Sequence, residues 1–318
     1  MGKYVITGGA GFIGSHLADY LICQGHEVVI IDNFYTGKHK NIHYALINKN
    51  CKLEPTSILD SEKCMWHMVG ADAVIHLAAI VNVMDCEQKP DYSKIINVDG
   101  FYNILGCAEA CNVKKVILAS SAAVYGEPEN TPSKEGDLTR PISNYGKNKE
   151  TCEHLARNFN ERVEVIIYRF FNVYGPRQDA SSPYSGVISK FINQMLNKEE
   201  STIFGNGEQT RDFIYVGDLV KAIIQHGLSE ETKTGVYNLG TGKGTSINKL
   251  YETLAFLMSK HGSMSVQCSY SQERPAEIKH SVADIKKICC NSSWRSYITL
   301  ENGLKKTIDY YKELKNES

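Results

Sequence analysis

Short runs of β-branched and other apolar residues alternate with longer amphipathic stretches in the first half of the chain. The apolar runs predict strands, and the helical spacing of apolar positions between them predicts helices. The predicted strands are Lys3–Thr7, Glu27–Ile31, Ala71–Leu77, Lys115–Ser120 and Val163–Tyr168, and the predicted helices are Phe12–Gln24, Asp91–Cys111 and Asn144–Asn160. Since strands alternate with helices and read as continuous apolar runs, we expect an α/β fold with a doubly wound parallel sheet.

The alternation loosens after Arg169. Residues 176–186 are rich in Pro, Ser, Gly and Asp, which predicts a loop. The elements predicted beyond it are the helices Gly186–Leu196, Val216–Gly227, Ile247–His261 and Leu300–Lys315 and the strands Thr202–Phe204, Arg211–Tyr215 and Val236–Leu239. We therefore expect a sheet domain of residues 1–171, to which segments near 212–239 return. A smaller α+β substrate domain would comprise residues 172–211 and 240–318.

The composition excludes two broad classes of partner. The chain has 318 residues, of which 42% are hydrophobic and 22% charged, and its formal net charge is −1. This balance is that of an ordinary globular protein and does not suit one that binds nucleic acid through bulk positive charge. It contains no polybasic anchor, and no apolar run approaches the ~20 residues of a membrane span. We expect neither nucleic acid nor membrane as a partner.

Ten cysteines raise the question of disulfides or metal sites. None forms a Cys-x-x-Cys pair, and no neighbouring histidines supply a zinc spacing, so we expect no metal. The first predicted strand begins at Lys3, which leaves no room for a signal peptide before it. We therefore expect reduced, mostly buried thiols and a cytoplasmic location.

A glycine-rich turn follows the first predicted strand and opens the first predicted helix. Glycines at 8, 9, 11 and 14 fit both Gly-x-Gly-x-x-Gly and Gly-x-x-Gly-x-x-Gly. Such a turn lets backbone N–H groups approach a pyrophosphate at a helix N-terminus. Asp32 ends the second predicted strand, where a carboxylate accepts hydrogen bonds from an adenosine ribose and repels a 2′-phosphate. We expect NAD rather than NADP as cofactor; the alternative is an Asp32 that merely caps a turn.

A second motif, Tyr145-x-x-x-Lys149, places a phenol and an ammonium on one helix face. The ammonium, together with a positive nicotinamide ring, would lower the pKa of the tyrosine and make it a workable base near neutral pH. The spacing alone is weak evidence among 18 tyrosines, and Tyr311 with Lys315 repeats it in the last predicted helix. We interpret that copy as a solvated helix face, because only Tyr145 follows a strand end that carries a hydroxyl, at Ser121.

Taken together, these features resemble the extended short-chain dehydrogenase/reductase superfamily, and within it the NAD-dependent UDP-hexose 4-epimerases. The likeness spans nearly the whole chain, and its motifs follow the family's order. The motifs are Thr7–Gly14, Asp32-Asn33, His76–Ala79, Asn97, Ser120–Gly126, Tyr145 with Lys149, Arg169–Gly175 and Arg211–Phe213. The resemblance implies a Rossmann-type NAD-binding domain followed by a domain that binds a UDP-sugar.

The resemblance also implies a catalytic set. Ser121 would hydrogen-bond the sugar 4-hydroxyl, Tyr145 would remove its proton, and Lys149 would hold the nicotinamide ribose and tune Tyr145. A hydride would pass from C4 to NAD and return to the other face of a bound 4-keto sugar, so NAD would stay bound through the cycle. The implied cofactor-binding residues are Gly8, Gly11, Phe12, Ile13, Gly14, Asp32, Asn33, Thr36, Gly37, Ser57, Ile58, Leu77, Ala78, Ala79, Asn97, Ser120, Tyr145 and Lys149.

Two positions depart from the family's pattern near the cofactor. Ser57 stands where the family usually has an Asp that binds the adenine amino group, although its hydroxyl can still accept that bond. Val81 stands where some members carry a Lys. The change at Ser57 predicts weaker retention of NAD, and neither change touches the hydride chemistry.

The resemblance further implies how the UDP-sugar is held. Asn172 and Arg211 would contact the diphosphate, the backbone of Thr202–Phe204 would hold uracil, Arg274 would grip the diphosphate, and Glu277 would bind a ribose hydroxyl. An arginine suits phosphate because its planar fork binds two oxygens at once. The implied substrate-binding residues are Ser121, Tyr145, Asn172, Thr202, Phe204, Arg211, Arg274, Glu277 and Ser281.

Ser281 occupies a position that acts as a gate beside the C2 substituent of the sugar in similar epimerases. A bulky Tyr there restricts the site to glucose and galactose, whereas a small residue leaves room for an N-acetyl group. We therefore expect UDP-GlcNAc and UDP-GalNAc to be accepted, unless other contacts decide. The likeness also implies a homodimer, in which Asp91–Cys111 and Asn144–Asn160 pair with their copies.

Related enzymes supply the alternatives. Sugar-nucleotide 4,6-dehydratases place an Asp-Glu pair after the catalytic hydroxyl, and uronate decarboxylases usually carry a Glu there, whereas this chain has Ala122 and Ala123. Uronic acid 4-epimerases usually show Thr at the position of Asn172. Simple epimerisation of a UDP-hexose is therefore favoured over dehydration, reduction, or a uronate or non-UDP substrate. A noncatalytic NAD-binding protein with the same fold remains the alternative from another class.

Overall fold

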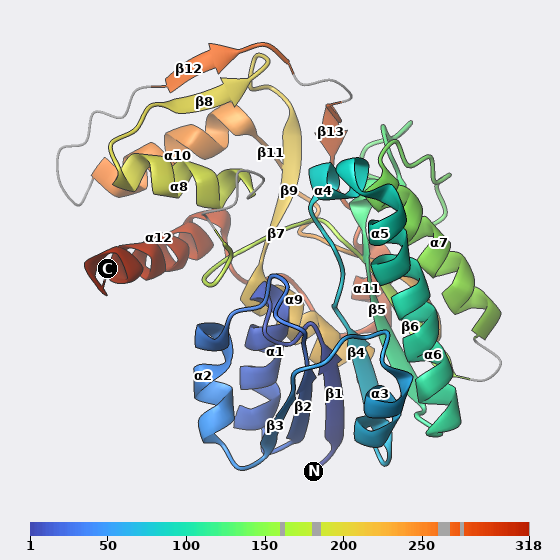
Figure 1. Ribbon diagram of the computed structural model, residues 1–318. Coiled ribbons are helices and arrows are strands. Elements are labelled where there is room, and N and C mark those ends of the chain that lie inside the picture. Colours follow the sequence, from blue (N-terminus) through green and yellow to red (C-terminus); the bar gives the residue numbers. More distant parts are fainter. Residues whose placement is uncertain (160–162, 180–185, 260–267, 274–276, 318) are drawn as a thin grey trace.

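The chain folds around a seven-stranded sheet, as the computed structural model in Figure 1 shows. The structure describes residues 1–159, 163–179, 186–259, 268–273 and 277–317. The strands are β1 (Lys3–Thr7), β2 (Glu27–Ile31), β3 (Cys51–Glu54), β4 (Ala73–His76), β5 (Lys115–Ser121), β6 (Glu164–Phe170) and β10 (Gly235–Leu239). All seven are parallel, in the order β10-β6-β5-β4-β1-β2-β3. The expected doubly wound parallel sheet is confirmed.

Helices cover both faces of this sheet and create two separate cores (Figure 1). One face carries α1 (Phe12–Cys23), α2 (His39–Ile47) and α9 (Val216–Ala222), and the other carries α3 (Ser61–Met68), α6 (Gly100–Ala110) and α7 (Asn144–Phe159). Successive side chains of β1 point to opposite faces of the sheet, so Val5 packs into the second core and Ile6 into the first. A strand covered on both faces needs apolar residues at every position, so these strands read as continuous apolar runs.

The strand order reverses beside β1, which fixes where a ligand binds. The chain builds β1, β2 and β3 toward one edge and then crosses to β4, β5 and β6 on the other side. In open α/β sheets, ligands bind at such a switch point, outside the carboxyl ends of the strands. The residues that directly follow β1, β2, β4 and β5 therefore face the expected site.

The C-terminal part forms two smaller sheets and a third core. The strands β7 (Asn172–Tyr174), β9 (Thr210–Tyr215), β11 (Gly244–Ser246) and β13 (His280–Ser281) make one sheet, and β8 (Ser201–Phe204) pairs with β12 (Cys268–Ser271). The helices α8 (Val187–Leu196), α10 (Ile247–Ser259) and α12 (Leu300–Glu317) share the third core. Of the segments near 212–239, α9 and β10 join the main sheet domain, whereas β9 belongs to the four-stranded sheet.

The helix predicted at Asp91–Cys111 is continuous but not uniform. It consists of α5 (Pro90–Lys94), a π-helical turn at Ile95–Asp99 and α6. The π turn contains Asn97, whose amide bonds both backbone groups of Ile80, accepting from N at 2.7 Å and donating to O at 3.0 Å. A wider turn of this kind often lies beside a functional site. Here it positions a buried amide against the loop after β4.

Several elements were not predicted. They are α2, β3, α3, β7, β11, β12, β13, α4 (Val83–Gln88) and α11 (Lys286–Asn291). Most are short or lie in polar sequence, so their apolar pattern is weak. The C-terminal end of the helix predicted at Ile247–His261, the last residue of Asn144–Asn160 and part of the predicted loop 176–186 fall outside the described residues.

The interpretation of Tyr311 as part of a solvated helix face is wrong. Tyr311 is buried in the third core, and its hydroxyl donates a hydrogen bond to the carbonyl oxygen of Gln178. Lys315 is exposed and donates to the carbonyl of Leu196 at 2.7 Å. The two residues therefore fasten α12 to other elements. Their spacing matches a catalytic motif only because both positions fall on one helix face.

All ten cysteines are free thiols in this structure, but fewer of them are buried than expected. Cys64, Cys86, Cys107 and Cys152 are buried, and only Cys23 and Cys290 are exposed. Across the part of the chain that the structure describes, no helix is both long and apolar enough to cross a membrane.

Candidate active site

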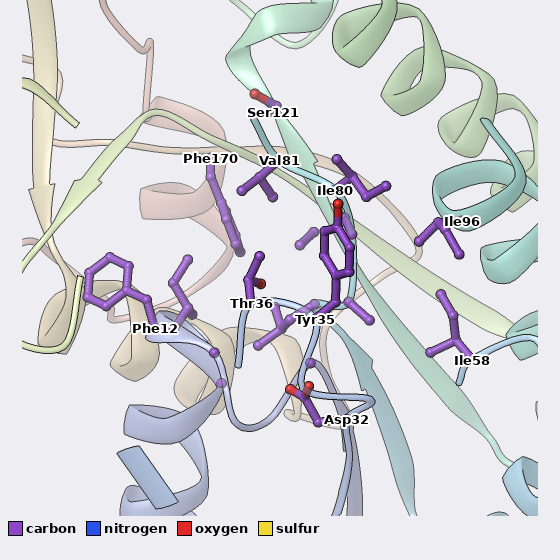
Figure 2. A pocket seen from close by; sticks show the side chains of 18 of the residues that line it. Phe12, Asp32, Tyr35, Thr36, Ile58, Ile80, Val81, Ile96, Ser121 and Phe170 are labelled. Atoms are coloured by element: carbon purple, nitrogen blue, oxygen red, sulfur yellow. The ribbon is translucent and has the colours of Figure 1, made fainter. Parts of the chain in front are cut away.

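A cavity of about 340 Å³ lies at the carboxyl ends of β1, β2, β4 and β5. Figure 2 shows Asp32 and Ser121 near opposite ends of this cavity, with Thr36, Tyr35 and Val81 between them. Its lining includes the expected residues Gly8, Gly11, Phe12, Ile13, Gly14, Asp32, Asn33, Thr36, Ser57, Ile58, Leu77, Ala78, Ala79, Ser120, Ser121, Tyr145 and Lys149. The fold thus gathers residues from the first 150 positions of the chain into one elongated site.

The glycine turn is packed against its surroundings. Gly8 has a φ of +72°, and a Cβ there would lie 2.7 Å from the backbone nitrogen of Ala78. A Cβ on Gly14 would lie 2.3 Å from the carbonyl oxygen of Gly8. Gly11 is the N-cap residue of α1. Since glycine has no side chain, it does not cap the first N–H groups of the helix. Because Phe12 and Ile13 line the cavity, the helix N-terminus provides donors suited to a pyrophosphate.

Asp32 both caps a turn and lines the cavity. Its carboxylate accepts hydrogen bonds from the backbone of Ala10 at 2.9 Å and of Phe34 at 2.8 Å. It therefore does cap a turn, yet it also lines the cavity at the end of β2. Burial raises the pKa of Asp32, while these two N–H groups favour its ionised form. A carboxylate held this way can still accept bonds from a ribose.

Two expected cofactor residues do not line the cavity. A Cβ on Gly37 would lie 2.7 Å from Oδ1 of Asp32, so this glycine allows the loop after β2 to close against the carboxylate. Asn97 lies outside the cavity lining and hydrogen-bonds the backbone of Ile80, which does line the cavity. Both residues shape the site without facing its interior.

The end of β5 and the start of α7 bring the expected catalytic residues together. The Ser121 hydroxyl accepts a hydrogen bond from the backbone of Ala123 at 3.1 Å, which fixes its oxygen at the strand end. Nζ of Lys149 donates to the carbonyl of Ala119 at 2.7 Å and lies 5.9 Å from the centroid of the Tyr145 ring. Ser121, Tyr145 and Lys149 all line the cavity. This is an arrangement of hydroxyl, phenol and ammonium suited to proton transfer.

The pKa of Tyr145 differs from the sequence-based expectation. Burial raises the pKa of the phenol to about 12, while its interaction with the Ser121 hydroxyl opposes this rise. Burial likewise lowers the pKa of Lys149. The protein alone therefore does not produce the low tyrosine pKa that was expected. That expectation included the positive charge of an oxidised nicotinamide ring, which is a property of the loaded site.

Several lining residues were missed by the sequence analysis. They are Tyr35, Thr56, Ile80, Tyr92, Ile96, Ala119 and Gln178. Phe170, Phe171 and Val173 were noted only as part of the motif Arg169–Gly175, and Val81 only as a departure. The rings of Tyr35 and Tyr92 lie 6.3 Å apart, although the two residues come from the loop after β2 and from α5. Tyr35 follows Asp32-Asn33 closely enough to have been suspected. Tyr92, Ile96 and Gln178 carry no local signal, because only the tertiary fold brings them to the cavity.

A five-residue segment, Gly175–Asp179, fastens the substrate side of the molecule to the nucleotide side. The carbonyl of Pro176 lies 2.9 Å from Nε2 of His16 on α1. Arg177 forms an ion pair with Asp19 of α1 at 2.6 Å, and Asp179 forms one with Lys38 at 2.7 Å. Within the segment, Gln178 lines the cavity. We call residues 175–179 the clasp.

The expected substrate residues gather on the small four-stranded sheet. Asn172 lies on β7, opposite Phe213 of β9, and Ser281 lies on β13, opposite Arg211 of β9. Arg211 also forms an ion pair with Glu277 at 2.5 Å, and burial lowers the pKa of this guanidinium. Arg211, Glu277 and Ser281 are therefore neighbours. None of the three lines the cavity described above.

The remaining substrate residues are less closely placed. Thr202 and Phe204 lie on β8, and the Phe204 carbonyl already accepts a hydrogen bond from the Gln209 side chain at 2.9 Å. Arg274 lies outside the described residues. Among the residues that are described, no three His, Cys, Asp or Glu side chains gather in a way that could hold a metal ion.

Comparison with known proteins identifies one matching family model. The model of the NAD dependent epimerase/dehydratase family matches residues 4–240. A putative UDP-glucose 4-epimerase of Methanocaldococcus jannaschii is 38% identical over 311 residues, which cover 97% of this chain and 98% of that protein. A UDP-N-acetyl-alpha-D-glucosaminuronate decarboxylase of Bacillus cytotoxicus is 35% identical over 324 residues and covers 99% of each chain.

A solved structure gives the same picture. The UDP-N-acetylglucosamine 4-epimerase from Methanobrevibacter ruminantium M1, in complex with UDP-N-acetylmuramic acid, has a TM-score of 0.92 and 37% sequence identity. The alignment covers 98% of this chain and 99% of that one. The similarity therefore extends over both the nucleotide side and the substrate side of the molecule.

Proposed function

Since this chain belongs to the NAD-dependent epimerase/dehydratase family, whose cofactor is NAD, we propose that it interconverts the C4 epimers of a UDP-hexose. The pairs in question are UDP-GlcNAc with UDP-GalNAc and UDP-glucose with UDP-galactose. The observation that carries the proposal is the set Ser121, Tyr145 and Lys149 at the end of β5, at one end of the cavity. A protein that only bound NAD would have no need of this set.

The cavity fits NAD on chemical grounds. The N-terminus of α1 has no side-chain cap, and the glycine turn before it has no space for a Cβ, so both suit the pyrophosphate. The Asp32 carboxylate suits a ribose hydroxyl. When bound, NAD accepts the hydrogen of sugar C4 with its electron pair and later returns it to the opposite face of the ketone. The protein must therefore hold the sugar, exclude water and move one proton.

The proton moves through Tyr145. As phenolate, Tyr145 accepts the proton of the sugar 4-hydroxyl while that hydroxyl is held by Ser121. The Lys149 ammonium stabilises the phenolate, because a positive charge near the ring favours the ionised form. In the second half of the cycle Tyr145 returns the proton to the oxygen at C4. No net redox change results, so one bound NAD serves many turnovers.

The residues after Ser121 favour epimerisation over the alternatives. Ala122 and Ala123 form a short 3₁₀ turn and offer no carboxyl group at that point. Elimination of water needs an acid and a base there in the dehydratases that this chain resembles, and uronate decarboxylases usually carry a Glu. The similarity to a decarboxylase is therefore one of framework, and the absence of the acid argues against its reaction.

Ser281 supports an N-acetylated substrate. It is partly buried and lies opposite Arg211 in the register of β13 and β9. A serine there leaves more space than an aromatic ring would, so we infer that the N-acetyl group of UDP-GlcNAc is accepted. Arg211 would bind the diphosphate after exchanging its present partner Glu277 for phosphate oxygens.

A homodimer is part of the proposal. Ile95 and Tyr102 on the helix Pro90–Ala110 are 43% and 55% exposed. Pairing of this helix and α7 with their copies would cover them. Light scattering coupled to gel filtration is expected to show a dimer, and Tyr102→Glu is expected to shift the protein toward monomer. A monomeric wild-type protein would contradict this part of the proposal.

The activity is tested with purified protein and no added cofactor. Proton NMR follows the anomeric signals of UDP-GlcNAc and of UDP-glucose in separate samples. Conversion of UDP-GlcNAc to UDP-GalNAc without build-up of NADH supports epimerisation, resident NAD and the open position at Ser281. Conversion of UDP-glucose alone supports the mechanism and contradicts the inference from Ser281.

Two controls complete the experiment. Tyr145→Phe keeps the ring and removes the hydroxyl, so turnover is expected to fall by about 10²–10⁴ while NAD remains bound. A parallel sample with UDP-glucuronic acid tests the uronate alternative. If no UDP-hexose is converted even with NAD supplied, the proposed substrate class is wrong.

A further inference from the structure

Glu153 extends the face of α7 that carries Tyr145 and Lys149. The three residues are spaced by four, so they lie on one side of the helix. Each is associated with one of the last three residues of β5: Lys149 bonds Ala119 and Glu153 bonds Ser120, while Tyr145 interacts with Ser121. We propose that Glu153 is a positioning residue for the catalytic set, which fixes α7 against the end of β5 and keeps Lys149 charged.

Three hydrogen bonds from Ser120 and Arg169 hold the Glu153 carboxylate in place. Oε1 accepts from the Ser120 hydroxyl at 2.6 Å and from Nε of Arg169 at 2.9 Å, and Oε2 accepts from Nη2 of Arg169 at 2.7 Å. The side chains of Arg169 and Glu153 are 1% and 2% exposed. One carboxylate therefore joins α7, β5 and β6 at the point where the catalytic residues stand. A bidentate pair of this kind restricts orientation as well as distance.

Arg169 is itself held in place, so the anchor is rigid. Its guanidinium lies 4.7 Å from the centroid of the Tyr125 ring, and its Nη1 donates to the carbonyl of Glu135 at 3.2 Å. The Tyr125 hydroxyl in turn donates to Asn238 of β10 at 2.7 Å. The position of Glu153 is thus set by three neighbouring strands, and the position of Lys149 one turn earlier on the helix follows from it.

The charge of Glu153 also matters to Lys149. Burial lowers the pKa of Lys149, while Cys152, Cys86 and Glu153 oppose that effect. Burial raises the pKa of Cys152 to about 11 and also raises that of Cys86, so both thiols are neutral near pH 7. Of these three groups, only Glu153 then supplies a negative charge. Without it, burial would favour the neutral amine, which cannot stabilise a phenolate.

The other groups around Lys149 do not replace this charge. Tyr145 precedes it on α7, and His76 of β4 faces it, with a pKa lowered to about 3 by burial and further by Lys149 itself. Arg169 of β6 carries a positive charge that the Glu153 carboxylate neutralises. The bound nicotinamide adds another positive charge when oxidised. With Tyr145 in its neutral form, none of these groups supplies a negative charge. Glu153, although it is paired with Arg169, is therefore the carboxylate that favours the ammonium form of Lys149.

The test titrates Lys149 directly and so does not depend on catalysis. Protein labelled with ¹³Cε-lysine is followed by NMR against pH, and Lys149→Met identifies the resonance. In Glu153→Gln, the pKa of Lys149 is expected to fall below that of the wild-type protein. The kcat is expected to fall at least tenfold with KM nearly unchanged, and the alkaline limb of its pH profile is expected to move to lower pH.

Matched variants separate this role from a general loss of structure. Arg157→Ala removes an exposed guanidinium 3.4 Å from the same carboxylate and is expected to leave both readouts unchanged. Should Glu153→Gln fail to fold because Arg169 is left unpaired, Glu153→Gln/Arg169→Met removes both buried charges and is expected to fold. In that double variant two opposite charges are removed together, so the pKa of Lys149 is expected to change less than in Glu153→Gln. The kcat is still expected to fall, because the link between α7, β5 and β6 is lost.

The outcomes are distinct. A folded Glu153 variant with an unchanged Lys149 pKa and unchanged kcat overturns the proposal. The inference rests on the proposed function only for its kinetic part: a wild-type protein that converts no UDP-sugar contradicts that function, whereas the Lys149 titration still decides the role of Glu153.

Discussion

The glycines of the nucleotide-binding turn are required by different neighbours. Gly8 has a left-handed backbone and lies against Ala78, Gly9 lies against the Ile30 side chain, and Gly14 lies against the Gly8 carbonyl. The closest of these approaches, at Gly14, is to backbone, which cannot move aside as a flexible side chain can. The motif is therefore a packing requirement of the βα turn as well as a binding feature.

Gly14→Ala tests this packing requirement. The added Cβ would lie 2.3 Å from the Gly8 carbonyl oxygen, so the turn must shift. We expect a loss of about 2–3 kcal/mol of stability from overpacking, together with loss of bound NAD. Denaturant unfolding and the NAD content of the purified protein measure the two effects. Gly136→Ala is the control, because a Cβ there meets nothing within 4 Å and stability should change by less than about 0.5 kcal/mol.

At the scale of elements, the clasp joins parts of the chain that are far apart in sequence. Its ion pairs reach back to Asp19 and Lys38, and Gln178 faces the cofactor cavity between them. Opening the cavity on this side must break these contacts. The clasp is therefore expected to slow the release of NAD, which an enzyme without net redox change needs to keep.

Arg177→Ala is the corresponding variant. It removes the ion pair with Asp19, in which both side chains are about one-fifth exposed, and keeps the left-handed backbone of that position. We expect NAD to dissociate about fivefold faster, corresponding to about 1 kcal/mol. Fluorescence of NADH during displacement by excess NAD measures the rate. Arg140→Ala removes an exposed ion pair with Glu129 and should leave the rate unaltered. Equal acceleration by both variants would refute the role of the clasp.

The sequence predicted the central elements well because burial on both faces makes them conspicuous. Val28–Ile31 is apolar at every position and was assigned correctly, whereas β3 contains only Leu53 as a strong apolar residue and was missed. In the site, Tyr145, Lys149 and Asp32 could be recognised from spacing and strand ends. Tyr92 and Gln178 could not, because their place in the cavity depends on contacts between distant elements.

For the molecule as a whole, the buried His76 and His226 and the partly buried His16 couple stability to pH. Burial lowers the pKa of His16 to about 4, of His76 to about 3 and of His226 to about 4. In the unfolded chain these residues titrate near 6.5. Between the two ranges the unfolded state binds more protons, so stability is fully present above about pH 6.5 and is lost as the pH falls toward 4.

The loss of stability is measurable as the slope of the free energy of unfolding against pH. Each histidine contributes up to about 1.4 kcal/mol per pH unit in that window. Urea unfolding between pH 4.5 and 7 is expected to show this decline. His226→Asn keeps a side-chain partner for the Tyr168 hydroxyl, which lies 2.6 Å from Nδ1 of His226, and should reduce the slope by about one proton. An unaltered slope in this variant would contradict the assignment.

The position of β10 also bears on how the protein is made. As a chain leaves the ribosome, β1, β4, β5 and β6 appear in the order in which they stand side by side. β10 belongs next to β6, but residues 171–234 must be synthesised first. Throughout that interval the edge of β6 lacks its partner and Tyr125 lacks Asn238. We therefore expect the unpaired edge of β6 to be the part of the nascent sheet most prone to wrong pairing until residues 235–239 have been synthesised.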